Sequence, residues 1–287
     1  MGWGDDLMWM GEASKVHADH PEAILHDGTA YSELWSEASW IGRPPKGSDY
    51  VQPRIEVPRK PGGNRWYVEG WGAGKAHLKP YQPTPAPYTV TSEEFWTARA
   101  LLKGAGVDTS KPFIIVNPDS KNTTFANNKN WGFDNWQSLV DIISKHITVV
   151  RLIPPKSVVD ISGLVEYNNP ELNNAVNIST STASIRQVFA INSLATGIVT
   201  TEGGLHHLAA ALNQRCFVIY GGVISPENTG YRDRNQTYYT YDNPNTPCGS
   251  QVDCQHCLKA MHSIKPSAVA DDVIRYLNHE QSNIYKG

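Results

Sequence analysis

The sequence predicts an α/β protein built on a parallel sheet. From residue 113 onward, short apolar runs typical of buried strands alternate with amphipathic helical segments, the order expected for right-handed strand-helix-strand crossovers. A second observation is an apolar strand that turns directly into a helix at Gly203 and Gly204. The two glycines either only allow the turn or also let the helix start bind an anion. The third is length, because 287 residues exceed the usual single domain and favour two.

The composition is that of an ordinary soluble globular protein. Hydrophobic residues make up 40% of the chain, charged residues 18%, and the net charge is −3, which excludes a disordered or strongly basic protein. No apolar run reaches the roughly 20 residues of a membrane span, and no signal sequence follows Met1, so we expect a cytoplasmic protein. Four cysteines, of which Cys216 lies in an apolar run, do not form a secreted disulfide scaffold.

The N-terminal part predicts short elements. Residues 5–18 read as a helix that begins at a Gly-Asp turn, where Asp5 is either a helix cap or a functional carboxylate. Residues 23–26 read as a short strand and residues 31–37 as a short helix. Such a turn normally follows a strand, but only three residues precede it here. Either the first strand is missing or the chain begins late.

Residues 41–80 differ from the rest of the chain. They hold eight basic and three acidic residues, with Arg65, Trp66 and Trp71 among many glycines and prolines. Basic side chains interleaved with aromatic ones can bind a phosphate backbone and stack on bases or sugars; the alternative is a solvated loop whose aromatics pack on the core. The proline-rich residues 79–87 predict an extended connector to the second half.

The second half predicts regular alternation. Expected helices cover residues 91–103 (capped by Thr91 or Ser92), 136–145, 184–191, 205–212 and a last one from Pro266; expected strands cover residues 113–116, 147–153, 194–199 and 216–220. Ligands bind at the carboxyl ends of strands in an open parallel sheet, so three loops should converge there. The candidate ligand-binding residues in these loops are Asn117, Ser120, Thr201, Glu202, Gly203, Gly204, Gly221 and Gly222.

A nucleotide is a plausible ligand for these loops. Neither G-x-G-x-x-G nor G-x-x-x-x-G-K-[ST] occurs, which argues against a nicotinamide dehydrogenase and a P-loop kinase. Lys129 is positioned in a polar loop and is a candidate cation for a diphosphate.

Four motifs match one known family in order and spacing. Residues 202–212, followed by residues 218–222, resemble the donor-binding signature of the heptosyltransferase-like glycosyltransferases of family 9. Lys129-Asn130-Trp131 resembles the family's Lys-x-Trp, and Gly4-Asp5-Asp6-Leu7 its N-terminal Gly-Asp-x-Leu. The resemblance covers nearly the whole chain, is strongest from Phe113 onward, and includes phage-type members among the candidates.

The resemblance implies a GT-B fold, in which two Rossmann-like domains face a cleft, with the N-terminal domain reduced and lacking the usual first strand. It implies an acceptor-side domain over residues 1–90, a nucleotide-sugar donor domain over residues 91–265 and a C-terminal helix over residues 266–287. The implied reaction moves a hexosyl, pentosyl or heptosyl group to an acceptor hydroxyl with inversion. No metal is required, and the donor is a co-substrate rather than a bound cofactor.

Site roles carry over by motif. Asp5 is expected to be the general base, and Lys129 with the helix start at Gly203 and Gly204 to stabilise the departing diphosphate. His207 matches the family histidine, with a purely structural role at the helix start as the alternative. Relatives usually have Asp-Thr-Gly where this chain has Glu202-Gly203-Gly204, which leaves the family's usual donor, an ADP-heptose, open here.

The acceptor and the partners stay open. One candidate acceptor is a saccharide; the other is a hydroxymethylated pyrimidine base in phage DNA, for which Arg65, Trp66 and Trp71 are the expected contacts. A non-catalytic nucleotide or sugar-binding protein on the same fold is the second alternative. The sequence does not predict an oligomeric state.

The cysteines form a second constellation. Cys248, Cys254 and Cys257 lie between the last expected strand and the last helix, with His256 and His262 nearby. A C-x-x-C pair with a third cysteine and a histidine can hold a tetrahedral structural metal, zinc or iron, and we expect His262 as the fourth ligand. Reduced, metal-free thiols are the alternative.

Overall fold

The computed structural model describes residues 2–21, 24–26, 32–42, 54–55, 68–69, 83–118, 123–160, 163–166, 171–231, 233–244, 246–250 and 252–284. The elements are α1 (Trp3–Asp19), β1 (Leu25–His26), η1 (Ser32–Trp35), β2 (Ile41–Gly42), β3 (Arg54–Ile55), β4 (Val68–Glu69), α2 (Ser92–Gly104), β5 (Phe113–Asn117), α3 (Thr124–Asn127), α4 (Phe133–Ile143), β6 (Thr148–Ile153), β7 (Ser157–Asp160), β8 (Gly163–Glu166), β9 (Val176–Ser179), α5 (Ile185–Ser193), β10 (Gly197–Thr201), α6 (Gly204–Ala211), β11 (Cys216–Gly221), α7 (Pro226–Thr229), β12 (Gln236–Thr240), α8 (Gln255–Ser263) and α9 (Pro266–Ile284). In these ranges no helix is both long and apolar enough to cross a bilayer.

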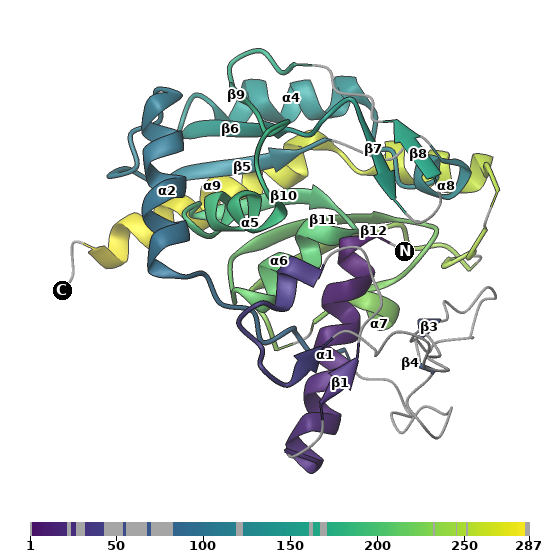
Figure 1. Ribbon diagram of the computed structural model, residues 1–287. Coiled ribbons are helices and arrows are strands. Elements are labelled where there is room, and N and C mark those ends of the chain that lie inside the picture. The colour runs from purple at the N-terminus through teal and green to yellow at the C-terminus, as the bar shows by residue number, and fades with distance from the viewer. Residues whose placement is uncertain are drawn as a thin grey trace.

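Six strands form one parallel sheet in the order β12-β11-β10-β5-β6-β9 (Figure 1). The three central strands β5, β10 and β11 are almost entirely buried, as expected where helices cover both faces of a parallel sheet. The edge strands β9 and β12 are only half-buried. The predicted α/β fold with a parallel sheet is therefore confirmed.

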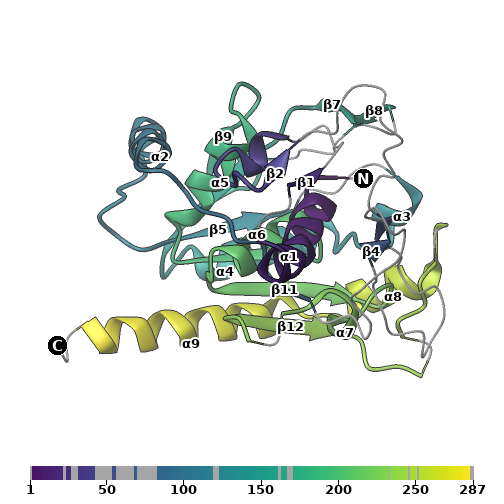
Figure 2. The ribbon, with the colours of Figure 1, turned by 60° about the horizontal axis from the view of Figure 1, so that its bottom comes forward.

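Alternate side chains of each strand enter two different cores. In β5, Ile115 packs in the core formed with α2 and α5, whereas Ile114 packs in the core formed with α4 and α9. Figure 2 shows α9 running along one face of the sheet. The predicted apolar stripe of α4, from Trp136 to Ile143, is buried in that core, so the helix periodicity is confirmed.

The N-terminal elements pack outside α5 and α6 as a further layer. Side chains of α1, η1 and the short parallel pair β1 and β2 form one apolar cluster with Phe189, Leu205 and Leu208. Helix α1 lies directly on α6 (Figure 1). A Cβ on Gly204 would lie 2.4 Å from the ring of Trp3, and one on Gly4 would lie 2.8 Å from the Cα of Gly204. These two glycines therefore let the helices approach closely.

Several boundaries test the sequence predictions. Helix α2 begins as predicted, with a capping box between Thr91 and Glu94. The strand predicted to begin at Leu194 begins instead at Gly197, because Leu194 is the C-cap of α5. The sequence analysis missed β9, β12 and α8. Within residues 41–80 the structure describes only 41–42, 54–55 and 68–69, so Arg65, Trp66 and Trp71 lie outside the described residues.

Candidate functional site

The carboxyl ends of β5, β10 and β11 meet at one edge of the sheet, as predicted. Asn117 is paired in register with Thr200, and its amide donates a hydrogen bond of 3.4 Å to the Thr200 hydroxyl. Thr201 lies opposite Ile219 of β11, and the backbone N–H of Glu202 donates to the Ile219 carbonyl at 3.0 Å. Ser120, expected here as well, lies outside the described residues.

A buried ion pair lies above this edge. The Lys129 ammonium, from the segment between α3 and α4, donates to Oε2 of Glu202, which follows β10. On its other side, Oε1 of Glu202 lies 3.8 Å from Nε2 of His207 in α6. The Glu202 side chain is only 3% exposed and that of Lys129 15%, so the pair is shielded from water. Lys129, from one predicted motif, thus pairs with Glu202 of another, and His207 of that second motif lies beside them.

Asp5 reaches the same place from the first turn of α1. Its Oδ2 accepts a hydrogen bond of 2.7 Å from the backbone N–H of Gly2, which is the N-cap of α1. Asp5 is therefore the third residue of the helix and not its cap, because the helix begins two residues earlier than the sequence predicted. Burial raises the pKa of Asp5, Lys129 opposes this rise, and the negative charge of Glu202 adds to it. The residue before it, Gly4, lies against Gly204 and the ring of His207, so the first turn of α1 adjoins the helix that follows Glu202. A role for Asp5 as a functional carboxylate stays a prediction.

The charges of this cluster follow from its contacts. Burial alone would raise the pKa of Glu202, but Lys129 and the neighbouring histidines hold it at about 2, so Glu202 is a carboxylate at neutral pH. Burial lowers the pKa of His207 to about 4, although Glu202 opposes this, and lowers that of His206 further. Both imidazoles are therefore neutral at pH 7.

The four glycines expected to face a ligand differ in their surroundings. A Cβ on Gly203 would meet nothing within 4 Å, whereas the space beside Gly204 is filled by Trp3. At Gly221, which has a φ of +63°, a Cβ would lie 2.1 Å from the sulfur of Met261, and at Gly222 it would lie 2.8 Å from Ala260. Gly204, Gly221 and Gly222 thus have a packing role, and a ligand role for their backbones stays a prediction.

Two residues around the site were missed by sequence reasoning. The Tyr231 hydroxyl lies 2.9 Å from Nδ1 of His207, on the side opposite Glu202. Asn128, fully buried beside Lys129, donates to the carbonyls of Val252 (2.8 Å) and Ser250 (3.3 Å). A single Tyr or Asn in a polar loop carries no spacing signal, so only the folded chain reveals these contacts.

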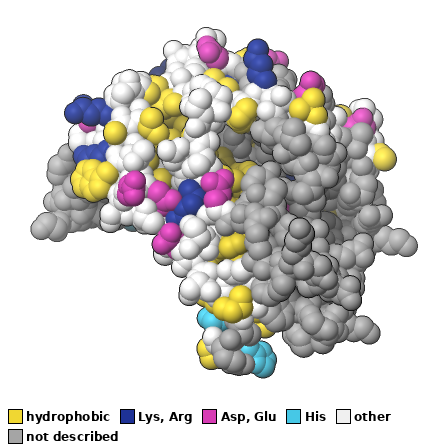
Figure 3. Space-filling model, in the orientation of Figure 1, with side chains coloured by type: hydrophobic (Ala, Val, Ile, Leu, Met, Phe, Trp, Pro, Cys, Tyr) yellow, Lys and Arg dark blue, Asp and Glu magenta, His cyan; other side chains and the backbone are white. Residues whose placement is uncertain are grey.

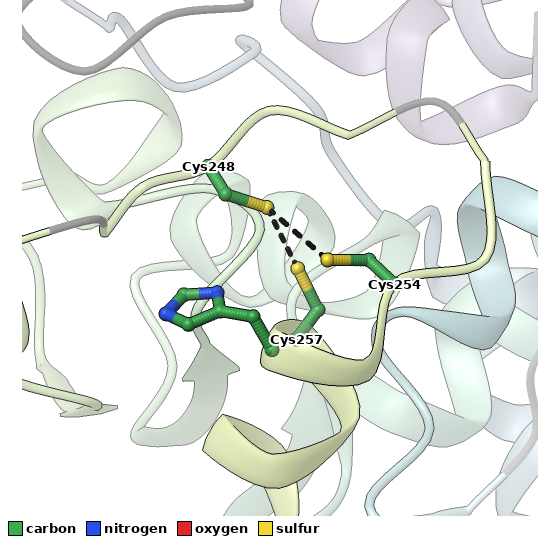
Figure 4. A group of neighbouring side chains, drawn as sticks. Cys248, Cys254 and Cys257 are labelled. Carbon is green, nitrogen blue, oxygen red and sulfur yellow. Dashed lines mark hydrogen bonds between the residues drawn. The ribbon is translucent and has the colours of Figure 1, made fainter.

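The three cysteines converge as predicted (Figure 4). Sγ of Cys248 lies 2.8 Å from Sγ of Cys257 and 4.0 Å from that of Cys254, distances too long for a disulfide. His256 completes a group whose ligand atoms all lie within 4.8 Å of one another, and its two buried ring nitrogens have no hydrogen-bond partner among the described residues.

The prediction of His262 as the fourth ligand is wrong. It is not a member of this group, and its imidazole lies instead beside Gly132. The reason is helical geometry, because Cys257 lies in α8 rather than in a loop, and His262 follows it by more than one turn of that helix. His256, adjacent in sequence to Cys257, takes that place.

Comparison with known proteins identifies the class. A parallel α/β sheet with a polar site at its carboxyl edge is typical of nucleotide-binding proteins. The family model of glycosyltransferase family 9 (heptosyltransferase) matches residues 75–266. The chain therefore belongs to glycosyltransferase family 9, a family of transferases. A search of curated proteins finds no match.

Solved structures similar to this chain include three from E. coli. The ADP-heptose LPS heptosyltransferase II shares 17% identity over 71% of this chain and 56% of its own, with a TM-score of 0.49. The structure of heptosyltransferase WaaC with ADP shares 15% sequence identity and covers 62% of this chain and 48% of its own, with a TM-score of 0.41. The iron-containing dodecameric glycosyltransferase TibC, from an enterotoxigenic strain, shares 12% sequence identity and covers 70% of this chain and 50% of its own, with a TM-score of 0.46. The chain thus spans about half the length of these structures.

Proposed function

We propose that this protein transfers a sugar from a nucleotide-sugar donor to an acceptor hydroxyl, with inversion and without a catalytic metal. The carrying observation is the shielded ion pair of Lys129 and Glu202 at the carboxyl edge of the sheet, with the first turn of α1, which holds Asp5, packed against Gly204 of α6. Family membership supports the class of reaction. A carboxylate of raised pKa favours catalysis over simple binding, because perturbed pKa values cluster at catalytic sites.

The chemistry assigned to each group follows from its position. Asp5 would accept the proton of the acceptor hydroxyl as its oxygen bonds to the anomeric carbon, and its raised pKa suits a general base. The bond from that carbon to the diphosphate oxygen would break, and the leaving diphosphate would keep the electron pair. Lys129 and the helix start at Gly203 would stabilise this negative charge. Attack on the face opposite the leaving group gives inversion.

A donor panel tests this proposal. The full chain is incubated with UDP-, ADP- and GDP-linked sugars, and slow hydrolysis and binding are followed by chromatography and calorimetry. We expect one nucleotide class to bind, and its sugar to be released slowly as water replaces the acceptor. Binding of free nucleotides with no release of sugar from any donor would support the binding-protein alternative. Absence of all binding would contradict both.

Duplex DNA remains the alternative acceptor, with the basic and aromatic residues 41–80 as its basis. On the face seen in Figure 3, the described Lys, Arg, Asp and Glu side chains are interspersed rather than gathered by sign. A gel shift at several salt concentrations separates the acceptors, because phosphate contacts weaken steeply as salt rises. If the protein does not bind duplex DNA even at low salt, a saccharide remains as the proposed acceptor.

We also propose that Cys248, Cys254, Cys257 and His256 hold a structural zinc or iron ion. The donor set fits, since three thiols and an orphaned buried imidazole converge. The backbone N–H of Cys254 donates to Asn128 at 2.8 Å, so the ion would fix the loop that carries Lys129.

Elemental analysis of the purified chain tests the metal. We expect about one equivalent of metal, lost in Cys254→Ser and kept in Cys216→Ser, which removes the buried thiol outside the cluster. Because Asn128, the neighbour of Lys129, accepts a hydrogen bond from Cys254, chelation should also weaken nucleotide binding. Substoichiometric metal in both the parent and Cys216→Ser would leave the thiols free.

A further inference from the structure

A row of buried polar side chains runs from Tyr231 to Lys129. The Tyr231 hydroxyl lies 2.9 Å from Nδ1 of His207, Nε2 of His207 lies 3.8 Å from Oε1 of Glu202, and Oε2 of Glu202 accepts from the Lys129 ammonium. Tyr231, His207 and Glu202 are each less than a tenth exposed. The carboxylate of Glu202 is therefore paired with a cation on one side and has a neutral imidazole next to it, at 3.8 Å, on the other.

The protons in this row have one consistent arrangement. Burial raises the pKa of Tyr231, so its phenol keeps its proton, while His207 is neutral and Glu202 negative at pH 7. A neutral imidazole beside a carboxylate is most stable with its N–H directed at that carboxylate, so the proton belongs on Nε2. Nδ1 then accepts the hydrogen bond from the Tyr231 hydroxyl. Tyr231 thus fixes both the tautomer and the orientation of His207.

This arrangement has a consequence for any anion at Lys129. The positive charge of Lys129 is already balanced by Glu202 within the protein, and Asp5 adds a second carboxylate nearby. A phosphate group that approaches Lys129 therefore meets the Glu202 carboxylate in a region shielded from water, where like charges repel strongly. It must displace Glu202 or share the lysine with it.

We propose that Glu202, held by Tyr231 through His207, is an internal counter-ion that occupies Lys129 and that the donor diphosphate has to displace. Glu202 thereby sets how tightly diphosphates bind, and Tyr231 is its positioning residue. This inference rests on the proposed function, because that function places the diphosphate at Lys129. The Glu202 carboxylate competes with the diphosphate for Lys129, so the diphosphate product should be bound weakly.

Inorganic pyrophosphate is the probe, because its binding depends on neither the base nor the sugar of the donor. Its affinity for the full chain is measured by calorimetry at pH 7.5 with EDTA. Glu202→Gln keeps the size of the side chain but removes its charge, and we expect about tenfold tighter binding, the effect of one like charge removed from a shielded site. Glu202→Asp keeps the charge and should bind within about threefold of the parent.

Tyr231→Phe tests the positioning role, with Tyr220→Phe as the matched control. Both tyrosines are buried, but the Tyr220 hydroxyl contacts His206 and Thr229 rather than His207. In Tyr231→Phe we expect about twofold to threefold tighter binding of pyrophosphate, and a change in the ring ¹⁵N chemical shifts of His207 as its tautomer is released. Tyr220→Phe should alter neither measurement.

The outcomes separate the inference from the proposed function. Weaker or unchanged binding in Glu202→Gln, in a parent that binds pyrophosphate and loses it in Lys129→Ala, would overturn the counter-ion and leave the proposed function standing. No binding in any variant would overturn both. Tight binding only in Glu202→Gln would support the counter-ion. If Glu202→Gln fails to fold, Tyr231→Phe decides, since unchanged binding and unchanged His207 shifts overturn the proposal.

Discussion

Two buried ion pairs in this protein are built in opposite ways. Arg186 of α5 pairs with both carboxylate oxygens of Glu94 in α2, and its guanidinium also donates to the carbonyls of Leu34 (3.3 Å) and Thr89 (3.0 Å). It lies over the ring of Tyr88, 4.9 Å from the centroid. Every neighbour of this cation is an acceptor or an aromatic face, so the pair joins two helices to the N-terminal layer at little electrostatic cost.

The pair of Lys129 and Glu202 has different neighbours among the described residues. They include a second carboxylate, Asp5, and two imidazoles that burial keeps neutral. The Asp5 and Glu202 carboxylates repel each other in a shielded site, which opposes the stability that Lys129 gives the pair. The comparison teaches that burial alone does not separate structural from functional pairs, whereas a second titratable carboxylate beside the pair does. Three predictions test this contrast.

The largest effect is expected for turnover in Asp5→Asn. The amide keeps an oxygen that can accept from the backbone of Gly2, so α1 stays capped, but it cannot take a proton from the acceptor. Turnover should fall by about 10²–10⁴-fold, the usual contribution of a general base, with donor affinity nearly unchanged. Glu94→Gln, in the structural pair, should keep near-parental turnover. Unchanged turnover in Asp5→Asn would remove Asp5 from the mechanism.

The second prediction concerns the free energy of unfolding, measured by urea denaturation. Glu94→Gln leaves the buried guanidinium of Arg186 without a counter-charge and should cost about 3 kcal/mol. Glu202→Gln should cost about 1 kcal/mol or less, because Asp5 remains as a negative neighbour of Lys129 and the repulsion between the two carboxylates is gone. Equal losses would show that both pairs serve stability alone.

The third prediction is the pH dependence of stability. The unfolded chain binds a proton on a histidine below about pH 6.5, but His207 in the folded chain does so only below about pH 4. The unfolded state therefore gains protons first, and stability should fall by up to about 3 kcal/mol as the pH drops from about 6.5 to about 4. The pKa of Glu94 is lowered by Arg186, so that pair contributes fully down to about pH 4.5 and is lost only below it.

Above pH 4.5 the loss therefore reports the site and not the structural pair. In His207→Asn the free energy of unfolding should change less with pH in this window. Some change should remain, because His206 is buried in the same way. His262→Asn, which removes an exposed imidazole, is the matched control. A parental slope that survives in His207→Asn would contradict the assignment.

The edge strands and α8 show which elements the sequence patterns do not predict. The buried strands and α4 were predictable because a strand covered on both faces must be apolar throughout, and a helix on a sheet must have an apolar stripe. Strand β12, Gln-Thr-Tyr-Tyr-Thr, has one neighbour and half-exposed side chains, so no apolar run marks it. Helix α8 begins at a cysteine with no side-chain cap, so no start signal marks it either.

For the site, the sequence motifs and the family resemblance singled out Asp5, Lys129 and Glu202 as candidates, and the structure pairs the last two. Only the tertiary structure decided how they meet. It placed Glu202 on Lys129, Tyr231 behind His207, Trp3 against Gly204, and His256 rather than His262 beside the thiols. The physical reason is that local patterns encode burial and backbone shape, whereas contacts between residues far apart in the sequence depend on how whole elements pack.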